Sequence, residues 1–148
     1  MMILEKPLGY LLCQTLRGYK NRLVLNFKEI GIGLSLEQFV ILHQISIKDD
    51  LTQQDLANHL QKDKSIILRQ INSLIDRNYV ERSPDKVDKR KKKLVLTKDG
   101  REVLTSTEEI ARNVSSELLS GVNNEDVDVF LTVLNKIQEN GGQDGDFL

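Results

Sequence analysis

The sequence contains few of the residues that mark several common protein classes: one cysteine, two prolines and no tryptophan in 148 residues. A single cysteine excludes an internal disulfide framework and favours a reducing, cytoplasmic setting. Low proline, nine glycines and the lack of polar tracts exclude a collagen-like or largely disordered chain. No apolar run exceeds four residues, so we expect neither a membrane span nor a signal-peptide core. The length allows one domain with a sizeable core.

The formal net charge is −1 and the sequence pI is about 6.1, values that on their own argue against a nucleic-acid partner. The charges are unevenly distributed, however. Residues 62–101 contain thirteen Lys or Arg and six Asp or Glu, whereas the rest of the chain contains eight basic and sixteen acidic residues. Such a polarised chain is expected to present a phosphate-binding surface. For Lys89–Lys93 alone, the alternative is a solvated loop that binds nothing.

Apolar residues recur with a helical period along most of the chain. A long helix is predicted from Pro7 to about residue 30, where Gly31 and Gly33 end it. Three shorter helices follow, and each is preceded by a residue that caps helix N-termini: Ser35, Thr52 and Asp63. The last of the three runs from Lys64 to about Arg77 and ends at Asn78, a residue that tolerates the left-handed conformation.

The period then changes to the alternation that is typical of β-strands. Tyr79–Arg82 and Lys93–Leu96 predict two short strands, joined by the polar loop Pro84–Lys92. Thr97 caps a further helix, and a final helix begins near Asn124. We expect the apolar residues of this final helix to lie inside, namely Val127, Phe130, Leu131, Leu134 and Ile137. The order of elements predicts a mainly α fold: a winged helix-turn-helix with a small β-hairpin wing, between long terminal helices.

In a winged helix-turn-helix, the second helix of the pair lies in the DNA major groove, which admits one helix. Here that helix is Lys64 to Arg77. Arg69 suits guanine O6 and N7, and Asn72 suits adenine. Ser65, with nearby backbone N–H groups, suits a phosphate. The candidate DNA-binding residues of this region are Lys62, Lys64, Ser65, Ile66, Arg69, Asn72 and Ser73, and the alternative is a polar face that meets only water.

Two stretches resemble the motifs of the multiple antibiotic resistance regulator (MarR) family. Asp88-Lys89-Arg90, Leu96-Thr97 and Gly100 match the family's D-x-R, L-T and G spacing. Leu51-Thr52-Gln53-Gln54-Asp55-Leu56-Ala57 resembles its third helix, and the likeness extends from about Leu8 to the last helix. The resemblance implies a homodimeric, cytoplasmic regulator of transcription, most simply a repressor, that binds double-stranded DNA at a pseudo-palindromic operator.

The resemblance also implies roles for the wing. Arg90 would enter the minor groove, and Asp88 would fix its guanidinium. A pair that only stabilises the hairpin is the alternative. The wing's candidate DNA-binding residues are Asp88, Lys89, Arg90, Lys91 and Lys92.

The implied organisation is a dimerisation helix at 1–34, a DNA-binding domain at 35–100, dimerisation helices at 101–140 and a flexible tail at 141–148, in one intertwined domain. The sequence departs from the family pattern at three positions. Ile66 and Leu68 replace common hydroxyl residues, which favours apolar contact with thymine methyl groups. Asn78 replaces a usual glycine, a change that its left-handed tolerance makes harmless.

Members of the family often bind small phenolic or other aromatic anions between the dimer and winged domains. The resemblance implies that such an effector pocket would be lined by Tyr10, Leu16, Arg17, Tyr19 and His43, and the alternative is plain core. Cys13 raises a second alternative, a thiol-based redox sensor like those of one branch of the family. Gln14 follows Cys13 where that branch tends to have an aromatic residue, and a free cysteine is commonly a small buried hydrophobe.

No metal site, cofactor or enzyme activity is predicted. His43 and His59 lie on different predicted helices without metal-ligand spacing. The sequence has no nucleophile elbow, phosphate-cradling glycine loop or zinc-protease pair. The remaining alternative is a winged-helix adaptor that contacts only proteins, and a basic wing with a D-x-R motif argues against it.

Overall fold

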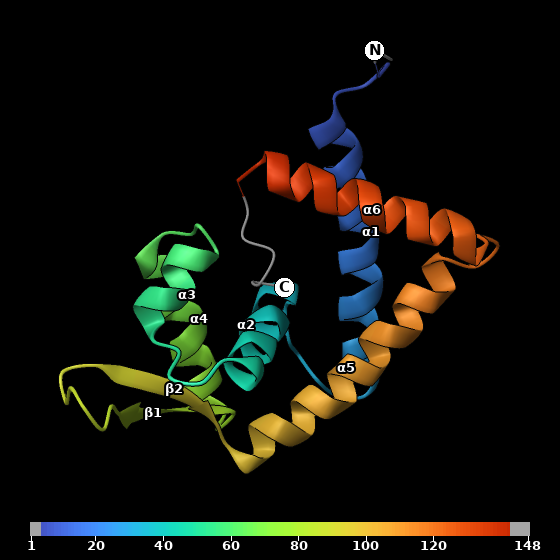
Figure 1. The fold of residues 1–148 in the computed structure, drawn as a ribbon. Helices are drawn as coiled ribbons and strands as arrows, with labels where there is room; N and C mark the ends of the chain where they lie inside the picture. Colours follow the sequence, from blue (N-terminus) through green and yellow to red (C-terminus); the bar gives the residue numbers. More distant parts are fainter. Residues whose placement is uncertain (1–3, 143–148) are drawn as a thin grey trace.

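The computed structural model describes residues 4–142 and contains a helical framework with one β-hairpin (Figure 1). In chain order its elements are α1 (Leu8–Glu29), α2 (Leu36–Ile47), α3 (Gln53–His59), α4 (Lys64–Asp76), β1 (Val80–Pro84), β2 (Lys92–Leu96), α5 (Lys98–Leu118) and α6 (Asn124–Asn140). The mainly α, winged helix-turn-helix prediction is confirmed. None of the helices within residues 4–142 combines the length and apolarity that a bilayer span needs.

The predicted caps begin the predicted helices. Ser35 and Thr52 each accept a hydrogen bond from the backbone N–H three residues ahead, and both sites are complete capping boxes. Asn78 has a positive φ of 62°, as expected for the residue that ends α4. Tyr79 donates its backbone N–H to the Leu74 carbonyl at 2.9 Å. Because that N–H closes the end of α4, β1 starts at Val80 and not at the predicted Tyr79.

The hairpin is antiparallel, with Val80 opposite Leu96 and Pro84 opposite Lys92. It is one or two residues longer at its distal end than predicted, because Pro84 takes the last register position, where the ladder ends. Leu94 also donates its backbone N–H to the Leu51 carbonyl at 2.8 Å. This bond joins β2 to the chain that leads into α3, so the hairpin is attached directly to the helix-turn-helix.

A single core connects the end of α1 with α2, the helix-turn-helix, the hairpin and α5. Its fully buried side chains each contribute about 1.5 to 3 kcal/mol through loss of apolar contact with water. The largest of them are Leu23, Phe27, Leu34, Ile41, Leu42, Leu56, Ile67, Ile71, Leu74, Val80 and Val114. This core fixes α4 and the hairpin relative to each other.

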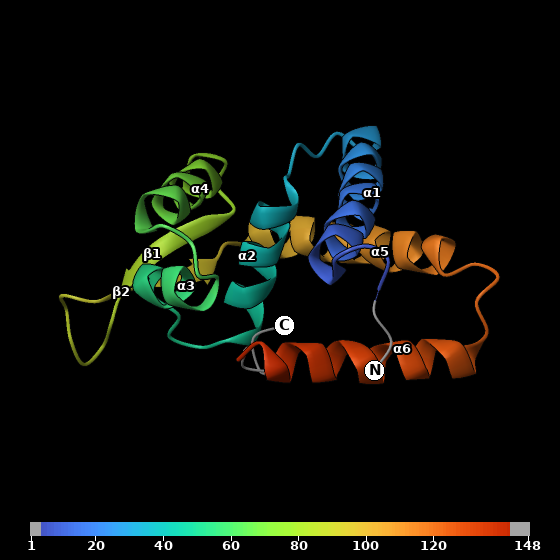
Figure 2. The same cartoon turned by 90° about the horizontal axis from the view of Figure 1, so that it is seen from above.

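Helix α6 packs differently from the prediction. None of its residues is buried within residues 4–142, and Phe130 and Leu131 are 49% and 50% exposed. The expectation that its apolar residues lie inside is therefore wrong for a single chain. After Gly121, whose φ is +85°, the chain turns away, and Figure 2 shows α6 running apart from α1 and α5. The N-terminal half of α1 is similarly uncovered, with Leu8, Leu12 and Leu16 exposed.

Candidate nucleic-acid interface

Helix α4 separates an apolar face from a polar one, as the sequence predicts. Ile67, Ile71 and Leu74 are buried, while Ser65, Arg69 and Asn72 are exposed on the opposite side. Ile66 is 41% exposed at the edge of this polar face. Within residues 4–142, no hydrogen bond or ion pair engages the Arg69 guanidinium. All five of its donors are available to an external acceptor.

The start of α4 is less open to a phosphate than the sequence suggests. The Ser65 backbone N–H donates to the Asp63 carboxylate at 3.1 Å, so Asp63 occupies the position that an anion would take. Lys62, one residue earlier, forms an ion pair with Glu37 of α2 at 3.3 Å. The Ser65 hydroxyl and the exposed Lys64 remain candidates for phosphate contact.

Two other predicted residues of α4 have partners inside the protein. Ser73 is half-buried, and its Oγ accepts from the Gln38 Nε2 of α2 at 3.3 Å. The hydroxyl is thus turned towards α2 and away from the exposed face. Asn72 is exposed, but its Oδ1 accepts from Nη2 of Arg82 at 2.8 Å.

Arg82 on β1 is a site residue that the sequence reasoning missed. Its Nε and Nη2 donate to Oε1 of Gln53 at 3.3 and 3.0 Å, in addition to the bond with Asn72. The guanidinium therefore ties the wing to the first turn of α3 and to the exposed face of α4. Its position in the basic segment 62–101 was the one available signal.

The loop between the strands protrudes from the end of the molecule that carries α3 and α4, as both views show (Figures 1 and 2). Two short turns shape it. Asp85 Oδ1 accepts from the backbone N–H of Val87, and Asp88 Oδ1 accepts from the backbone N–H of Arg90, each at 3.0 Å. Such Asx turns hold the loop backbone without help from the core.

The role predicted for Asp88 is different in the structure. Its carboxylate binds the Arg90 backbone and not the guanidinium, because the two-residue spacing brings the N–H of Arg90 within reach of an Asx turn. Asp88 therefore positions Arg90 through its main chain. No ion pair or hydrogen bond within residues 4–142 engages the exposed side chains of Lys89, Arg90, Lys91 and Lys92.

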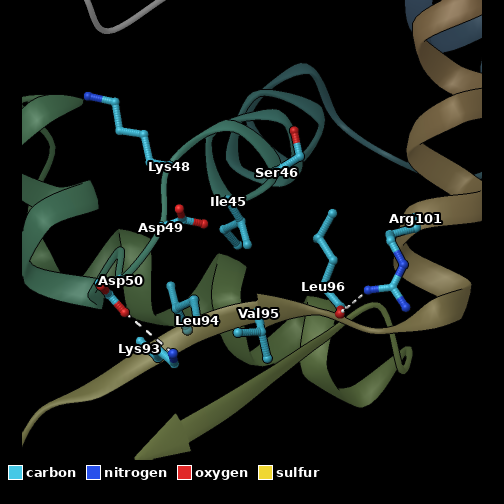
Figure 3. A pocket seen from close by; sticks show the side chains of 10 residues that line it. All are labelled: Ile45, Ser46, Lys48, Asp49, Asp50, Lys93, Leu94, Val95, Leu96 and Arg101. Atoms are coloured by element: carbon cyan, nitrogen blue, oxygen red, sulfur yellow. Dashed lines mark hydrogen bonds and ion pairs between the residues drawn. The ribbon is translucent and has the colours of Figure 1, made fainter. Parts of the chain in front are cut away.

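A hollow of about 440 Å³ lies at the base of the wing, between the end of α2, β2 and the start of α5 (Figure 3). Lys93 reaches Asp50 at 3.4 Å across it, and Arg101 donates to the Leu96 carbonyl at 3.1 Å. These contacts attach β2 to its neighbours on both sides. The Lys93 ammonium group therefore has a partner within the protein, whereas the side chains of Lys89, Arg90, Lys91 and Lys92 have none within residues 4–142.

The sequence predicts five lining residues for an effector pocket, namely Tyr10, Leu16, Arg17, Tyr19 and His43. A separate open cavity of about 650 Å³ lies between α2 and α5, and His43 is the one predicted residue that lines it. There His43 Nδ1 lies 2.8 Å from a carboxylate oxygen of Glu108. Burial raises the pKa of Tyr19, and a side-chain hydrogen bond with Ser115, another lining residue, partly offsets that shift. The remaining predicted residues, Tyr10, Leu16 and Arg17, are exposed on α1.

Cys13 is a free, exposed thiol on α1, not a buried one. Across residues 4–142, no three His, Cys, Asp or Glu side chains are grouped as metal ligands.

Comparisons with known proteins agree with this geometry. Residues 34–92, from the loop before α2 into the start of β2, match the MarR family model. The regulator BldR from Sulfolobus solfataricus is 29% identical, over 90% of this chain and 93% of that one, with a TM-score of 0.77. A MarR transcriptional regulator from Methanosarcina mazei Go1 is 26% identical, over 90% and 94% of the two chains, with a TM-score of 0.79.

The transcriptional repressor CouR, solved with a 23-mer DNA duplex, is 20% identical over 88% of this chain and 92% of that one, with a TM-score of 0.79. At that identity the likeness concerns the fold. Residues 34–92 are thus similar to the MarR family, in a chain that shares the winged-helix fold of MarR-family transcriptional regulators along most of its length.

Proposed function

We propose that the protein is a regulator of transcription that binds a pseudo-palindromic operator in double-stranded DNA as a homodimer. The observation that carries the proposal is the joint exposure of Arg69 on α4 and of four cations at the tip of the wing, Lys89, Arg90, Lys91 and Lys92, none of which has a hydrogen-bond or ion-pair partner for its side chain within residues 4–142. Helix α4 and the wing lie on the same side of the molecule, and the wing loop points away from α6 (Figures 1 and 2). A helix for the major groove and a basic loop for the neighbouring minor groove match the dimensions of B-DNA.

The uncovered apolar surfaces of α1 and α6 support dimerisation. A second copy would cover them and carry a second winged domain. Two such domains would bind half-sites about one helical turn, roughly 34 to 36 Å, apart.

Repression and response to an effector are the finer parts of the proposal. The likeness to the DNA-bound repressor CouR supports the first. The second is supported by the cavity between α2 and α5, because these helices link the winged domain to the terminal helices. A small aromatic or phenolic anion is the proposed ligand, with the Arg112 guanidinium as its cationic partner in the lining and His43 as a further polar contact. The exposure of Cys13 keeps the thiol-based alternative testable with Cys13→Ser and peroxide.

DNA binding can be tested by selecting bound duplexes from a random pool and then titrating one selected duplex in increasing salt. We expect a strong salt dependence, because each neutralised phosphate contributes a slope of about −0.9 in log K against log salt. A slope near zero would favour the protein-contact adaptor instead.

The wing predicts a large effect of Arg90→Ala. Loss of this guanidinium should weaken binding to the selected duplex about 10- to 100-fold, as expected for a charge-assisted contact in an electronegative minor groove. The oligomeric state should not change, since the loop lies far from α6. Lys28→Ala, an equal charge change at an exposed residue in the last turn of α1, is the matched control and should bind DNA with nearly wild-type affinity. Unchanged affinity in a fluorescence anisotropy titration of Arg90→Ala would contradict the wing assignment.

Arg69→Ala should act on specificity. If Arg69 contacts guanine O6 and N7, its removal relaxes discrimination by about 1 to 3 kcal/mol at one base position of each half-site. Affinities for duplexes that vary at single positions measure this. A uniform loss across all sequences would show that Arg69 contacts a phosphate and does not read a base.

A further inference from the structure

The contact between Arg82 and Asn72 changes what Asn72 can read. Nη2 of Arg82 has two hydrogens, and they are directed to Asn72 Oδ1 at 2.8 Å and Gln53 Oε1 at 3.0 Å. Nε of the same guanidinium also donates to Gln53 Oε1, at 3.3 Å. Asn72 remains exposed on the outer face of α4, while Arg82 is half-buried between the wing and the helices.

The orientation of the Asn72 amide follows from the chemistry of its partner. A guanidinium has only N–H donors, so the amide atom that faces it at hydrogen-bond distance must be the carbonyl oxygen. A flipped amide would set two donors against each other. The Asn72 amino group, with two N–H donors, is therefore directed away from Arg82.

We propose that Arg82 holds Asn72 as a donor-only reader, so that the operator position facing Asn72 is guanine and not adenine. This inference rests on the proposed DNA-binding function. Asparagine recognises adenine through two bonds: it donates to N7 and accepts from the N6 amino group. Here Arg82 already occupies one of the two lone pairs of the accepting oxygen, and the positive guanidinium beside that oxygen repels the hydrogens of an adenine amino group. Guanine presents two acceptors, N7 and O6, which match the free amino group.

The same contacts also restrict the motion of the Asn72 side chain. Arg82 comes from β1, Gln53 from the first turn of α3 and Asn72 from α4, so three elements fix one amide. An amide held in place before binding loses less rotamer freedom on contact with DNA. Arg82 is thus a positioning residue, and the expectation from the sequence that Asn72 reads adenine does not fit this arrangement.

The experiment is to select duplexes from a random pool with the wild type, Arg82→Met and Asn72→Asp, and to compare base frequencies position by position. The wild type should prefer guanine over adenine at one position of each half-site by about tenfold, the scale of one specific base contact. Arg82→Met frees the amide to rotate and should reduce or reverse that preference at the same position. Asn72→Asp keeps a partner for Arg82 but has no donor, and should lose the guanine preference.

A duplex with 7-deazaguanine at that position gives a second measurement. Removing N7 should weaken wild-type binding several-fold and leave Asn72→Asp binding unaffected, as expected for the loss of one base acceptor. Lys98→Met, which removes an exposed cation outside the Arg82 contacts, is the control and should keep the wild-type base preference. Thermal unfolding of each variant checks that the fold is retained.

The experiment distinguishes a failure of this inference from a failure of the proposed DNA-binding function. If the wild type selects no sequence at all, the proposed function fails, and this inference fails with it. If the wild type selects a sequence but prefers adenine at the Asn72 position, or keeps the same preference in Arg82→Met and Asn72→Asp, the inference is overturned while the proposed function stands.

Discussion

Gly100→Ala should destabilise the protein by about 3 kcal/mol or more, because no relaxed position exists for the added methyl group. A Cβ on Gly100 would overlap the backbone carbonyl oxygen of Tyr79 and would lie 2.9 Å from its carbonyl carbon and 3.2 Å from its Cα. These are main-chain atoms at the junction of α4 and β1. They cannot move without breaking the bond between the Thr97 N–H and the Tyr79 carbonyl, which measures 3.1 Å.

Urea unfolding followed by circular dichroism measures this effect. Gly18→Ala is the matched control, because a Cβ there meets nothing within 4 Å and the residue lies inside α1. That substitution should be neutral or stabilising by about 0.5 to 1 kcal/mol, since glycine is unfavourable inside a helix. If Gly100→Ala unfolds at the same urea concentration as the wild type, the close approach to Tyr79 does not limit stability.

This junction explains the L-T and G part of the motif that the sequence analysis singled out. Thr97 Oγ1 accepts from the Gly100 N–H at 2.9 Å and thereby caps α5. The same hydroxyl donates to the Asn78 carbonyl, and Asn78 Nδ2 donates to Asp99 at 3.0 Å. The threonine and glycine therefore join the start of α5 to the end of α4. Their role is to fix the wing and α4 relative to α5.

The features that the sequence predicted well are local ones. Capping residues, the apolar period of α4 and the left-handed Asn78 each depend on residues within one or two helical turns, so the sequence displays them directly. The side-chain pairs of the candidate site are not local. Arg82 lies 29 residues from Gln53, and Ser73 lies 35 residues from Gln38. No periodicity encodes such pairs, and for this reason Asn72 and Ser73 were predicted as uncommitted polar residues.

Asp88 shows a different limit of prediction from the sequence. The D-x-R spacing was interpreted through the side chains of both residues, whereas the structure uses one side chain and one main-chain N–H. An aspartate two residues before a backbone N–H forms an Asx turn readily, and this local bond competes with an exposed ion pair that contributes little.

Charge substitutions on the apolar face of α6 should convert a dimer into monomers and lower operator affinity at least 100-fold. Phe130 and Val133 are each about half exposed, at 49% and 50%, and lie one turn apart on the same side of the helix. The apolar positions of α6 cover more than half of its circumference, which exceeds the stripe that one neighbouring surface covers. In a single chain nothing buries them within residues 4–142, and most of the stability of a helix in a protein comes from packing of its apolar face. In the proposed homodimer, a second copy would supply the missing surface.

The test compares Phe130→Glu/Val133→Lys with Thr132→Glu/Asn135→Lys, which introduces the same two charges at the same spacing on the polar face of α6. Light scattering should give about twice the 16.9 kDa chain mass for the wild type and the control, and the chain mass for the apolar-face variant. A monomer has one winged domain and binds one half-site, so it loses the affinity gained from a second, physically linked domain. That gain is typically 10²- to 10⁴-fold. An apolar-face variant that keeps the wild-type mass would show that α6 is covered in another way. One that becomes monomeric but binds DNA at full strength would show that a single winged domain suffices.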